Sequence, residues 1–286
     1  MSWRALFGLG AAVLAVSFGA PLARMTDAAP LAVAMWRMCL SVAFLLPLVT
    51  LRGGWSVPPR HRPAAILAGI LLGLHFGLWI PSLWLTSVSA SVVLVTTSPL
   101  WVLLLSPRFL GSAIGRRNLA SFVLALTGVV IIVGGDLTLS PKALLGDGMA
   151  LAAAGCMAGY LVVGKKLRSE LSLASYLAVV YGGAAVVLIG AVAVLRVAPW
   201  PASRGAWLPL IGLAVGPTLT GHSLLNWALA HTQAYRVNLT VLLEPVLASF
   251  WTWLFVGEAP PLHVVPGAAL VISALALECL PAAKRS

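Results

Sequence analysis

The sequence predicts an all-α polytopic membrane protein in which ten transmembrane helices form two inverted five-helix repeats. Three observations support this fold class. Hydrophobic residues make up 60% of the 286 residues and charged residues only 9%, whereas about a quarter of the residues of a soluble domain are charged. The apolar residues gather in runs of about 20, the length that crosses the hydrocarbon core as a helix. Patterns of the first half of the chain also return in the second half.

Ten apolar runs are separated by short breaks rich in glycine, proline and charged residues, and no break is long enough to be a domain. Barrel strands would alternate polar and apolar residues, and no such alternation appears. The first run follows Arg4 and is long for a cleaved signal peptide, so we expect it to remain as a span. The predicted spans are 5–23, 32–51, 63–84, 88–110, 117–134, 147–166, 173–195, 205–229, 235–256 and 262–281.

The distribution of positive charge predicts the orientation in the membrane. The formal net charge is +11, and positive residues of short loops stay on the cytoplasmic side. With the N-terminus inside, most Lys and Arg residues fall on the cytoplasmic side, and the outer side holds only Arg24, Lys142, Arg196 and Arg204. We therefore expect both termini in the cytoplasm and a multi-pass protein of the inner (plasma) membrane. The basic charge predicts attraction to the anionic headgroups of the lipid bilayer and no binding of nucleic acid.

The sequence lacks the motifs of common catalytic chemistry. No phosphate-binding loop, HExxH, CxxC or GxSxG pattern appears, so we expect no enzyme, no cofactor and no metal. Cys39, Cys156 and Cys279 fall inside apolar runs, where thiols pack as small hydrophobic groups. No disulfide framework is indicated.

An internal repeat relates the two halves. LTSVSASVVLVTTSPLWVLLLS at 85–106 and HTQAYRVNLTVLLEPVLASFWT at 231–252 align so that Pro99 meets Pro245 inside apolar frames of equal length. FGLGAAVLAV from Phe7 similarly aligns with LGDGMALAAA from Leu145. Repeats of this length indicate a duplicated architecture.

The repeat divides the chain into 1–140 and 141–286, with five predicted spans in each part. Because five is odd, the second part crosses the membrane upside down relative to the first. Secondary transporters often use inverted repeats, with the substrate site near the midplane between them.

Three stretches resemble the EamA-type members of the drug/metabolite transporter superfamily. They are SVSASVVLVTTSPLW at 87–101, LLGDGMALAAAGCMAGYLVVGKKL at 144–167 and LLEPVLASFWTWLFVGE at 242–258. The resemblance implies ten helices with cytoplasmic termini, no ATP-binding domain, and export or exchange of small metabolites, often amino acids. The first half departs from the pattern because Ser98 stands where the second half has Glu244.

Apart from charged residues near the span ends, two charged residues fall within predicted spans, Arg37 and Glu244. Glu244 lies about 13 Å into its span at 1.5 Å per residue, and intramembrane ionisable groups are often functional. It is a coupling site, a counter-charge for an amine, or an acid that braces its helix. Arg37 could neutralise an anionic substrate or pair with Glu244, but we expect it to snorkel to the interface or to bond loop carbonyls.

Matching helices carry polar and aromatic residues that predict a shared central cavity. His75 and Trp79 are four residues apart, as are His222 and Asn226 in the equivalent span, so each pair shares a helix face. Trp101 and Tyr160 offer aromatic surfaces for apolar or ammonium groups. The alternative is interhelical hydrogen bonding for the histidines and interfacial packing for the aromatic residues.

Four prolines fall inside or near spans and predict kinks that shape gates: Pro81, Pro99, Pro217 and Pro245. From these features we expect a secondary-active transporter that exports or exchanges small metabolites by alternating access, with hydrophobic or aromatic amino acids as the first choice of substrate. The alternative is proton-coupled efflux of cationic drugs, and a remote alternative is an intramembrane enzyme or scaffold. We expect a monomer or homodimer.

Overall fold

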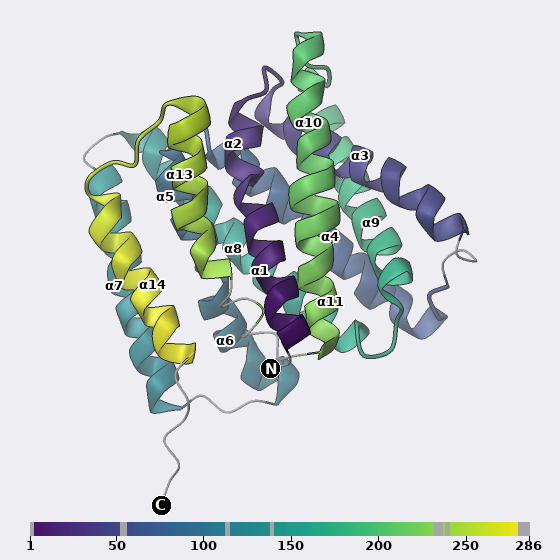
Figure 1. Ribbon diagram of the computed structural model, residues 1–286, viewed down its shortest axis with the longest axis horizontal. Helices are drawn as coiled ribbons and strands as arrows, with labels where there is room; N and C mark the ends of the chain where they lie inside the picture. Colours follow the sequence, from purple (N-terminus) through teal and green to yellow (C-terminus); the bar gives the residue numbers. More distant parts are fainter. Residues whose placement is uncertain are drawn as a thin grey trace, which may run out of the picture.

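A computed structural model describes residues 3–51, 56–111, 115–137, 140–231, 237 and 241–279, and all regular structure within these residues is helical. The elements are shown in Figure 1. They are α1 (Trp3–Ser17), α2 (Gly19–Arg24), α3 (Pro30–Leu51), η1 (Pro59–His61), α4 (Arg62–Ser82), α5 (Val88–Val95), α6 (Ser98–Leu110), α7 (Arg116–Leu137), α8 (Pro141–Leu167), α9 (Leu173–Val194), η2 (Arg204–Ala206), α10 (Trp207–Leu213), η3 (Ala214–His222), α11 (Ser223–His231), η4 (Val241–Leu243), α13 (Glu244–Val256) and α14 (Val264–Cys279).

Seven segments within the described residues are long and apolar enough to cross a membrane. They correspond to the predicted spans one to four and six to eight, and the all-helical membrane class is confirmed. The other three predicted spans contain α7, α13 and α14. In the predicted span 235–256, residues 235, 236 and 238–240 lie outside the described residues. The count of ten spans therefore stays a prediction.

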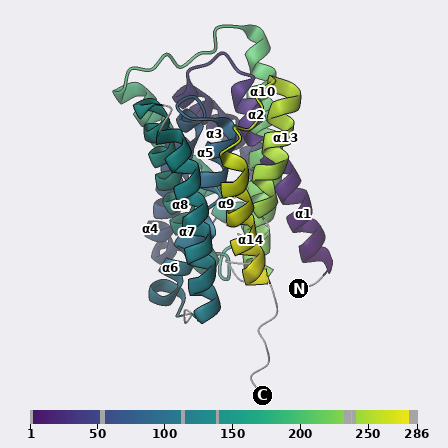
Figure 2. The same ribbon diagram turned by 90° about the vertical axis from the view of Figure 1, so that its left-hand side faces the viewer.

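The helices stand roughly side by side along one direction (Figure 2). The start of α1 and the end of α14 lie at the same end of the bundle (Figures 1 and 2). We call this end of the bundle the terminal end and the other the opposite end. An even number of crossings brings the chain back to the side on which it began.

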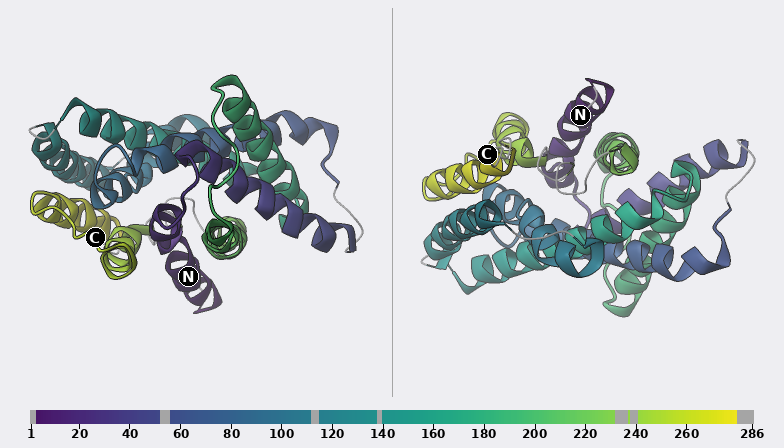
Figure 3. Two further views of the ribbon diagram at one scale, coloured as in Figure 1. Left: turned by 90° about the horizontal axis from the view of Figure 1, so that it is seen from above. Right: turned by 90° about the horizontal axis from the view of Figure 1, so that it is seen from below.

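Helices from the two parts of the chain are interleaved in the packing. Helix α4 packs against α8 and α9, α3 packs against α9, and α7 packs against α14. Views along the bundle show the yellow α14 beside α7 at one edge, and α1 beside the green helix of α10 to α11 on the same side of the bundle (Figure 3). The core is thus formed between the two parts and not separately within each.

The fourth predicted span is interrupted where a continuous helix was expected. Helix α5 ends at Val95 and α6 begins at Ser98. The hydroxyls of Thr96 and Thr97 donate to the carbonyls of Val93 and Leu94, at 2.9 and 2.7 Å, and so satisfy the last turn of α5. Pro99 follows and has no N–H with which to continue the ladder. The predicted kink at this proline is instead a helix break.

The aligned proline of the second half, Pro245, lies in the first turn of a helix. The short 3₁₀ helix η4 precedes α13, whose first two residues are Glu244 and Pro245. Proline is well tolerated in the first helical turn because its missing N–H would have no partner there. The carboxylate of Glu244 thus lies at the N-terminal end of a half-helix, where the helix dipole favours negative charge.

The eighth predicted span contains a π-helical segment, η3, with Pro217 inside it. The hydroxyl of Thr218 donates to the carbonyl of Leu213 at 3.0 Å. A π-turn adds one residue per turn and widens the helix, which relieves the clash between a proline ring and the preceding turn. The predicted kink at Pro217 is thus a local widening, whereas Pro81 lies in the last turn of α4.

Close packing of α7 against α14 depends on Gly128. A Cβ added at this position would lie 2.6 Å from the Gly267 carbonyl oxygen and 2.9 Å from the Val271 side chain. We expect Gly128→Ala to lower the free energy of unfolding by about 1 kcal/mol or more, because overpacking forces the two helices apart. The thermal unfolding midpoint in detergent measures this effect. Gly190→Ala, with nothing within 4 Å of the added Cβ, is the matched control, and an equal loss in the control would contradict a specific role of Gly128 in packing.

Candidate functional site

A small cavity lies beside the first residues of α6 and α13. Its volume is about 30 Å³, room for a few water molecules and far below the several hundred Å³ of a typical ligand site. The helices must therefore move apart to admit a metabolite. The lining residues come from α1, α3, α4, α5, α6, α8, η3, α11, η4, α13 and the break after α5: Val16, Arg37, His75, Trp79, Val95, Thr96, Ser98, Met157, His222, Leu225, Val241 and Glu244.

Arg37 is buried, and the expectation that it snorkels to the interface is wrong. Its exposed fraction is 1%. Nε donates to Thr218 Oγ1 at 2.8 Å, and the guanidinium carbon lies 4.0 Å from the Phe76 ring centroid. A short polar contact and an aromatic face therefore hold the guanidinium at the cavity wall, in the protein interior.

Glu244 lies at the same cavity as Arg37. Its exposed fraction is 8%, and it lines the cavity from the first residue of α13. No ion pair within 4.0 Å joins them, since the pairs formed among the described residues involve other side chains. Two buried opposite charges thus share one cavity without direct contact.

The structure brings His75, Trp79 and His222 together at the cavity wall. The His75 ring is stacked on Trp79 with a centroid distance of 6.0 Å and meets His222 edge-on at 6.4 Å. His75 Nδ1 lies 3.0 Å from the Ala153 carbonyl oxygen. A carbonyl only accepts, so Nδ1 is the donor and a neutral His75 ring keeps Nε2 as an acceptor.

Asn226 and Tyr160 form a polar layer next to the cavity. The Asn226 amide donates to the Tyr160 hydroxyl and to the His222 carbonyl at 2.7 Å. Tyr160 is stacked on Tyr176 with centroids 6.5 Å apart. Both predicted residues therefore support the segment that carries His222, and neither is among the residues that line the cavity.

Trp101 was predicted to be part of the cavity wall, but the structure places it elsewhere. It is 40% exposed and is not among the lining residues. Its ring lies beside Gly155 of α8, 3.8 Å from an added Cβ. Ser98, at the start of the same helix, does line the cavity, so α6 leads away from the cavity within its first turn.

Three lining residues carry a buried polar atom without a hydrogen-bond partner in the described part of the chain: Arg37 Nη1, Trp79 Nε1 and His222 Nδ1. Most buried polar atoms in proteins have a partner, because an unpaired one costs about 1–3 kcal/mol. Such atoms gathered around one cavity are typical of a ligand site.

Several lining residues were not predicted as site residues. Thr96 and Ser98 reach the cavity only because the helix breaks beside them, and Val16, Met157 and Leu225 add apolar surface. The run Thr-Thr-Ser-Pro carried a signal for the break, because the residue before a proline avoids helical geometry. The apolar lining residues carried no signal that distinguishes them from lipid-facing ones.

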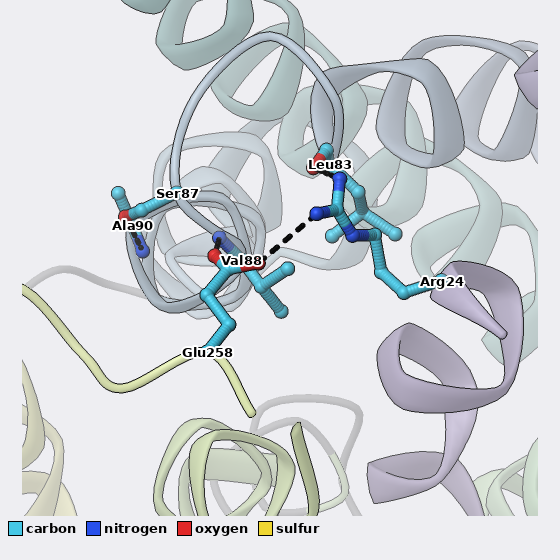
Figure 4. Close-up of polar contacts among 6 residues, drawn as sticks. All are labelled: Arg24, Leu83, Ser87, Val88, Ala90 and Glu258. Carbon is cyan, nitrogen blue, oxygen red and sulfur yellow. Dashed lines mark hydrogen bonds and ion pairs between the residues drawn. The ribbon is translucent and has the colours of Figure 1, made fainter. Parts of the chain in front are cut away.

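An ionic cluster joins the two halves at the opposite end. Arg24 Nη2 lies 3.1 Å from Glu258 Oε2, and Glu258 Oε1 accepts a hydrogen bond from the Val88 backbone N–H at 2.9 Å. Arg24 Nη1 also donates to the Leu83 carbonyl at 3.0 Å. Figure 4 shows Glu258, from the segment after α13, reaching to the start of α5 and to Arg24. We call Arg24, Leu83, Val88 and Glu258 the opposite-end tie.

A second ionic contact joins the halves near the end of α8. Arg60 Nη2 and His61 Nε2 each lie 3.0 Å from Glu170 Oε2. Glu170 closely follows α8, whose last turn bonds to the last turn of α11 through Lys165 and the Leu229 carbonyl. That turn lies at the terminal end (Figure 1). We call Arg60, His61 and Glu170 the terminal-end tie.

No group of three or more His, Cys, Asp or Glu side chains that could hold a metal ion occurs within the described ranges. The chemistry that the described lining residues offer is charge pairing, hydrogen bonding and aromatic contact.

A multi-pass helical bundle with a buried, charged cavity between its two parts defines a membrane transport protein. Residues 2–134 and 144–278 each match the profile of the EamA-like transporter family. The chain belongs to this family, whose members are transporters of small molecules across the membrane.

Similar proteins agree with this assignment. Two relatives from Bacillus subtilis (strain 168) are the uncharacterized transporter YdfC, 26% identical over 217 residues covering 74% of this chain and 70% of the relative, and the uncharacterized transporter YoaV, 25% identical over 240 residues covering 81% and 80%. A solved crystal structure aligns with a TM-score of 0.69 at 18% identity and covers 97% of each chain. This last likeness concerns the fold alone.

Proposed function

We propose that the protein is a secondary-active transporter of the inner membrane that exports or exchanges amino acids, hydrophobic or aromatic ones above all, by alternating access. The observation that carries this proposal is the cavity itself. It lies beside the starts of α6 and α13, holds one buried basic and one buried acidic side chain, and is otherwise lined by aromatic and apolar side chains with a few hydroxyls. A small zwitterion with an apolar side chain matches this lining.

The packing supports two inverted repeats, 1–140 and 141–286, of five spans each. If the halves are equivalent, the pair α1 and α2 corresponds to α8, α3 to α9, α4 to the segment from α10 to α11, the pair α5 and α6 to α13, and α7 to α14. The contacts then occur in matched pairs. Helix α4 packs on α8 as η3 and α11 pack on α1, and α5 and α6 pack on α8 as α13 packs on α1 and α2. A pseudo-twofold axis between the halves would produce this pattern.

The ties at the two ends support alternating access. Each joins a residue of the first half to a residue of the second, at opposite ends of the bundle (Figure 1). Opening toward one side requires only that one tie breaks while the other persists. Such a pair of weak contacts suits a protein that exchanges two conformations of similar free energy.

The tie at the opposite end gives a testable prediction. Glu258→Gln removes the ion pair with Arg24. Both side chains are partly exposed, Arg24 by 24% and Glu258 by 29%. A pair of this kind contributes about 0.2–1 kcal/mol, so the variant should favour the form that is open at that end. We expect faster modification of a cysteine at cavity position Val95, in a background without native cysteines, by a membrane-impermeant thiol reagent added from the outer side.

Glu170→Gln, which breaks the terminal-end tie, is the matched control. It should slow the same reaction, because it favours the other open form. Equal acceleration in both variants would indicate general loosening of the bundle and would contradict the proposal of two alternating gates.

The second candidate function is proton-coupled efflux of cationic drugs, which the buried carboxylate of Glu244 favours. Arg37 at the same cavity opposes it, since a cationic cargo meets a like charge there.

A thermal-shift screen of the purified protein tests the proposed cargo class. A ligand that binds the folded state raises the unfolding midpoint. We expect hydrophobic and aromatic amino acids to raise it and lipophilic cations to leave it unchanged. A shift by the cations alone would overturn the amino-acid proposal in favour of drug efflux.

A further inference from the structure

We propose that the cavity recognises both charged groups of a free α-amino acid, with Arg37 and Trp79 binding the carboxylate and Glu244 binding the ammonium group. This inference rests on the proposed function and assigns each pole of the cargo to particular residues.

The carboxylate side follows from two donors that lack acceptors. Arg37 Nη1 and Trp79 Nε1 are both buried N–H donors without a hydrogen-bond partner among the described residues. The guanidinium carbon of Arg37 lies 5.9 Å from the Trp79 ring centroid, so the two side chains are neighbours at the wall of the same cavity. A carboxylate fits these two donors, because it carries negative charge and can accept a hydrogen bond from each of them.

The position of Arg37 is fixed before any ligand binds. Nε is held by Thr218 Oγ1 at 2.8 Å, and the face of the guanidinium lies 4.0 Å from the Phe76 centroid. Thr218 in turn donates to the Leu213 carbonyl at the start of the π-helical segment. The helix widening therefore positions a hydroxyl that directs Arg37, and a preorganised cation binds with less loss of side-chain entropy.

The ammonium side follows from the charge of Glu244 and its separation from Arg37. Glu244 is the one carboxylate among the residues that line the cavity in the described part of the chain, and it lies more than 4.0 Å from Arg37. A buried pair that closed directly would satisfy itself and leave no charge for a ligand. A zwitterion placed between the two groups neutralises both at once.

The neutral part of the lining agrees with this orientation. Val16, Val95, Met157, Leu225 and Val241 supply apolar surface to the same cavity. An apolar side chain of the cargo gains about 25 cal/mol per Å² of surface removed from water there. The charged residues would thus select the amino-acid backbone, and the apolar residues would select among side chains.

Calorimetric titration of the full-length protein in detergent tests the assignment with three ligands of one shape. They are phenylalanine, phenethylamine, which lacks the carboxylate, and 3-phenylpropanoate, which lacks the ammonium group. We expect phenylalanine to bind about 10- to 100-fold more tightly than either analogue, the factor that loss of a hydrogen bond to a charged group brings.

Two variants assign the poles. Arg37→Gln should weaken phenylalanine binding by a similar factor but should not weaken phenethylamine binding, because that ligand has no carboxylate and meets one like charge fewer. Glu244→Gln should weaken phenylalanine binding but should not weaken 3-phenylpropanoate binding, for the same reason. Arg204→Gln and Asp27→Asn make the same changes at exposed positions and should leave all three affinities unchanged.

The outcomes separate this inference from the function on which it rests. Wild-type protein that binds phenethylamine as tightly as phenylalanine overturns the assignment and leaves amino-acid transport standing, and this comparison needs no variant to fold. Arg37→Gln protein that loses affinity for all three ligands equally also overturns it. Failure of the wild type to bind any amino acid overturns both proposals.

Discussion

Replacing Glu244 with glutamine is expected to slow amino-acid exchange by about 10- to 100-fold at subsaturating substrate, because a charged partner of the cargo becomes neutral at unchanged size. Glu244 begins α13 and reaches the cavity that Arg37 also lines. The measurement is uptake of labelled phenylalanine into proteoliposomes preloaded with unlabelled phenylalanine, at equal pH on both sides. Asp27→Asn removes an exposed carboxylate and should exchange at the wild-type rate.

The same variant distinguishes exchange from proton coupling. If Glu244 carries the coupling proton, Glu244→Gln abolishes uptake driven by a pH gradient while exchange at equal pH continues. Loss of exchange at equal pH points instead to a role in binding the cargo. Wild-type rates under both conditions would show that Glu244 only braces its helix and would contradict its assignment to the ammonium group.

Replacing Asn226 with leucine is expected to reduce both stability and transport. Its amide links α8 to α11 by donating to the Tyr160 hydroxyl and to the His222 carbonyl. Leucine is of similar size but leaves both buried acceptors without a donor, at a total cost of about 1–3 kcal/mol. Transport should fall as well, because the segment carrying His222 loses its attachment to α8. Thermal unfolding in detergent and the exchange assay measure the two effects.

A double-mutant cycle with Tyr160→Phe isolates the interhelical part of this effect. In the Tyr160→Phe background, Asn226→Leu should cost less than in the wild type, because the hydroxyl partner is already absent. Purely additive losses would mean that the Asn226–Tyr160 contact contributes no stability.

The spans could be predicted from the sequence because a helix that crosses the bilayer needs a long run of apolar residues, and such runs can be recognised in the sequence alone. The interruption of the spans could not be predicted from hydropathy. Thr96 and Thr97 are apolar enough to remain in a span, and only their hydroxyl bonds to the carbonyls of Val93 and Leu94 show how α5 can end there. The break also places Ser98 at the wall of the cavity and leads α6, with Trp101, away from it.

The internal repeat was the most informative feature for the site. It made the helices that carry His75 and His222 equivalent, and the two rings lie 6.4 Å apart at one cavity. Asn226 shares a helix face with His222 but does not line the cavity. Its amide is instead hydrogen-bonded to the Tyr160 hydroxyl and to the His222 carbonyl. Helical spacing identifies residues on one face, whereas the neighbouring helix determines which of them reach the cavity.

The burial of Arg37 contradicts a sequence-based expectation for a physical reason. An arginine about 10 Å into an apolar helix can extend toward the headgroups, so its position alone favoured snorkelling. The Phe76 face and the Thr218 hydroxyl, both on other helices, hold it in the interior instead. The depth of Arg37 in the span nevertheless indicated a functional residue, since charged side chains inside the membrane are usually paired and functional.

The central claim is that this EamA-family protein moves amino acids across the membrane through the cavity between Arg37 and Glu244. Counterflow in proteoliposomes tests it most directly: labelled hydrophobic and aromatic amino acids are supplied outside, with the same unlabelled amino acid inside. We predict saturable accumulation that depends on the internal amino acid and is strongly reduced by Arg37→Gln. Uptake no greater than in protein-free liposomes for every amino acid in the panel would contradict the claim.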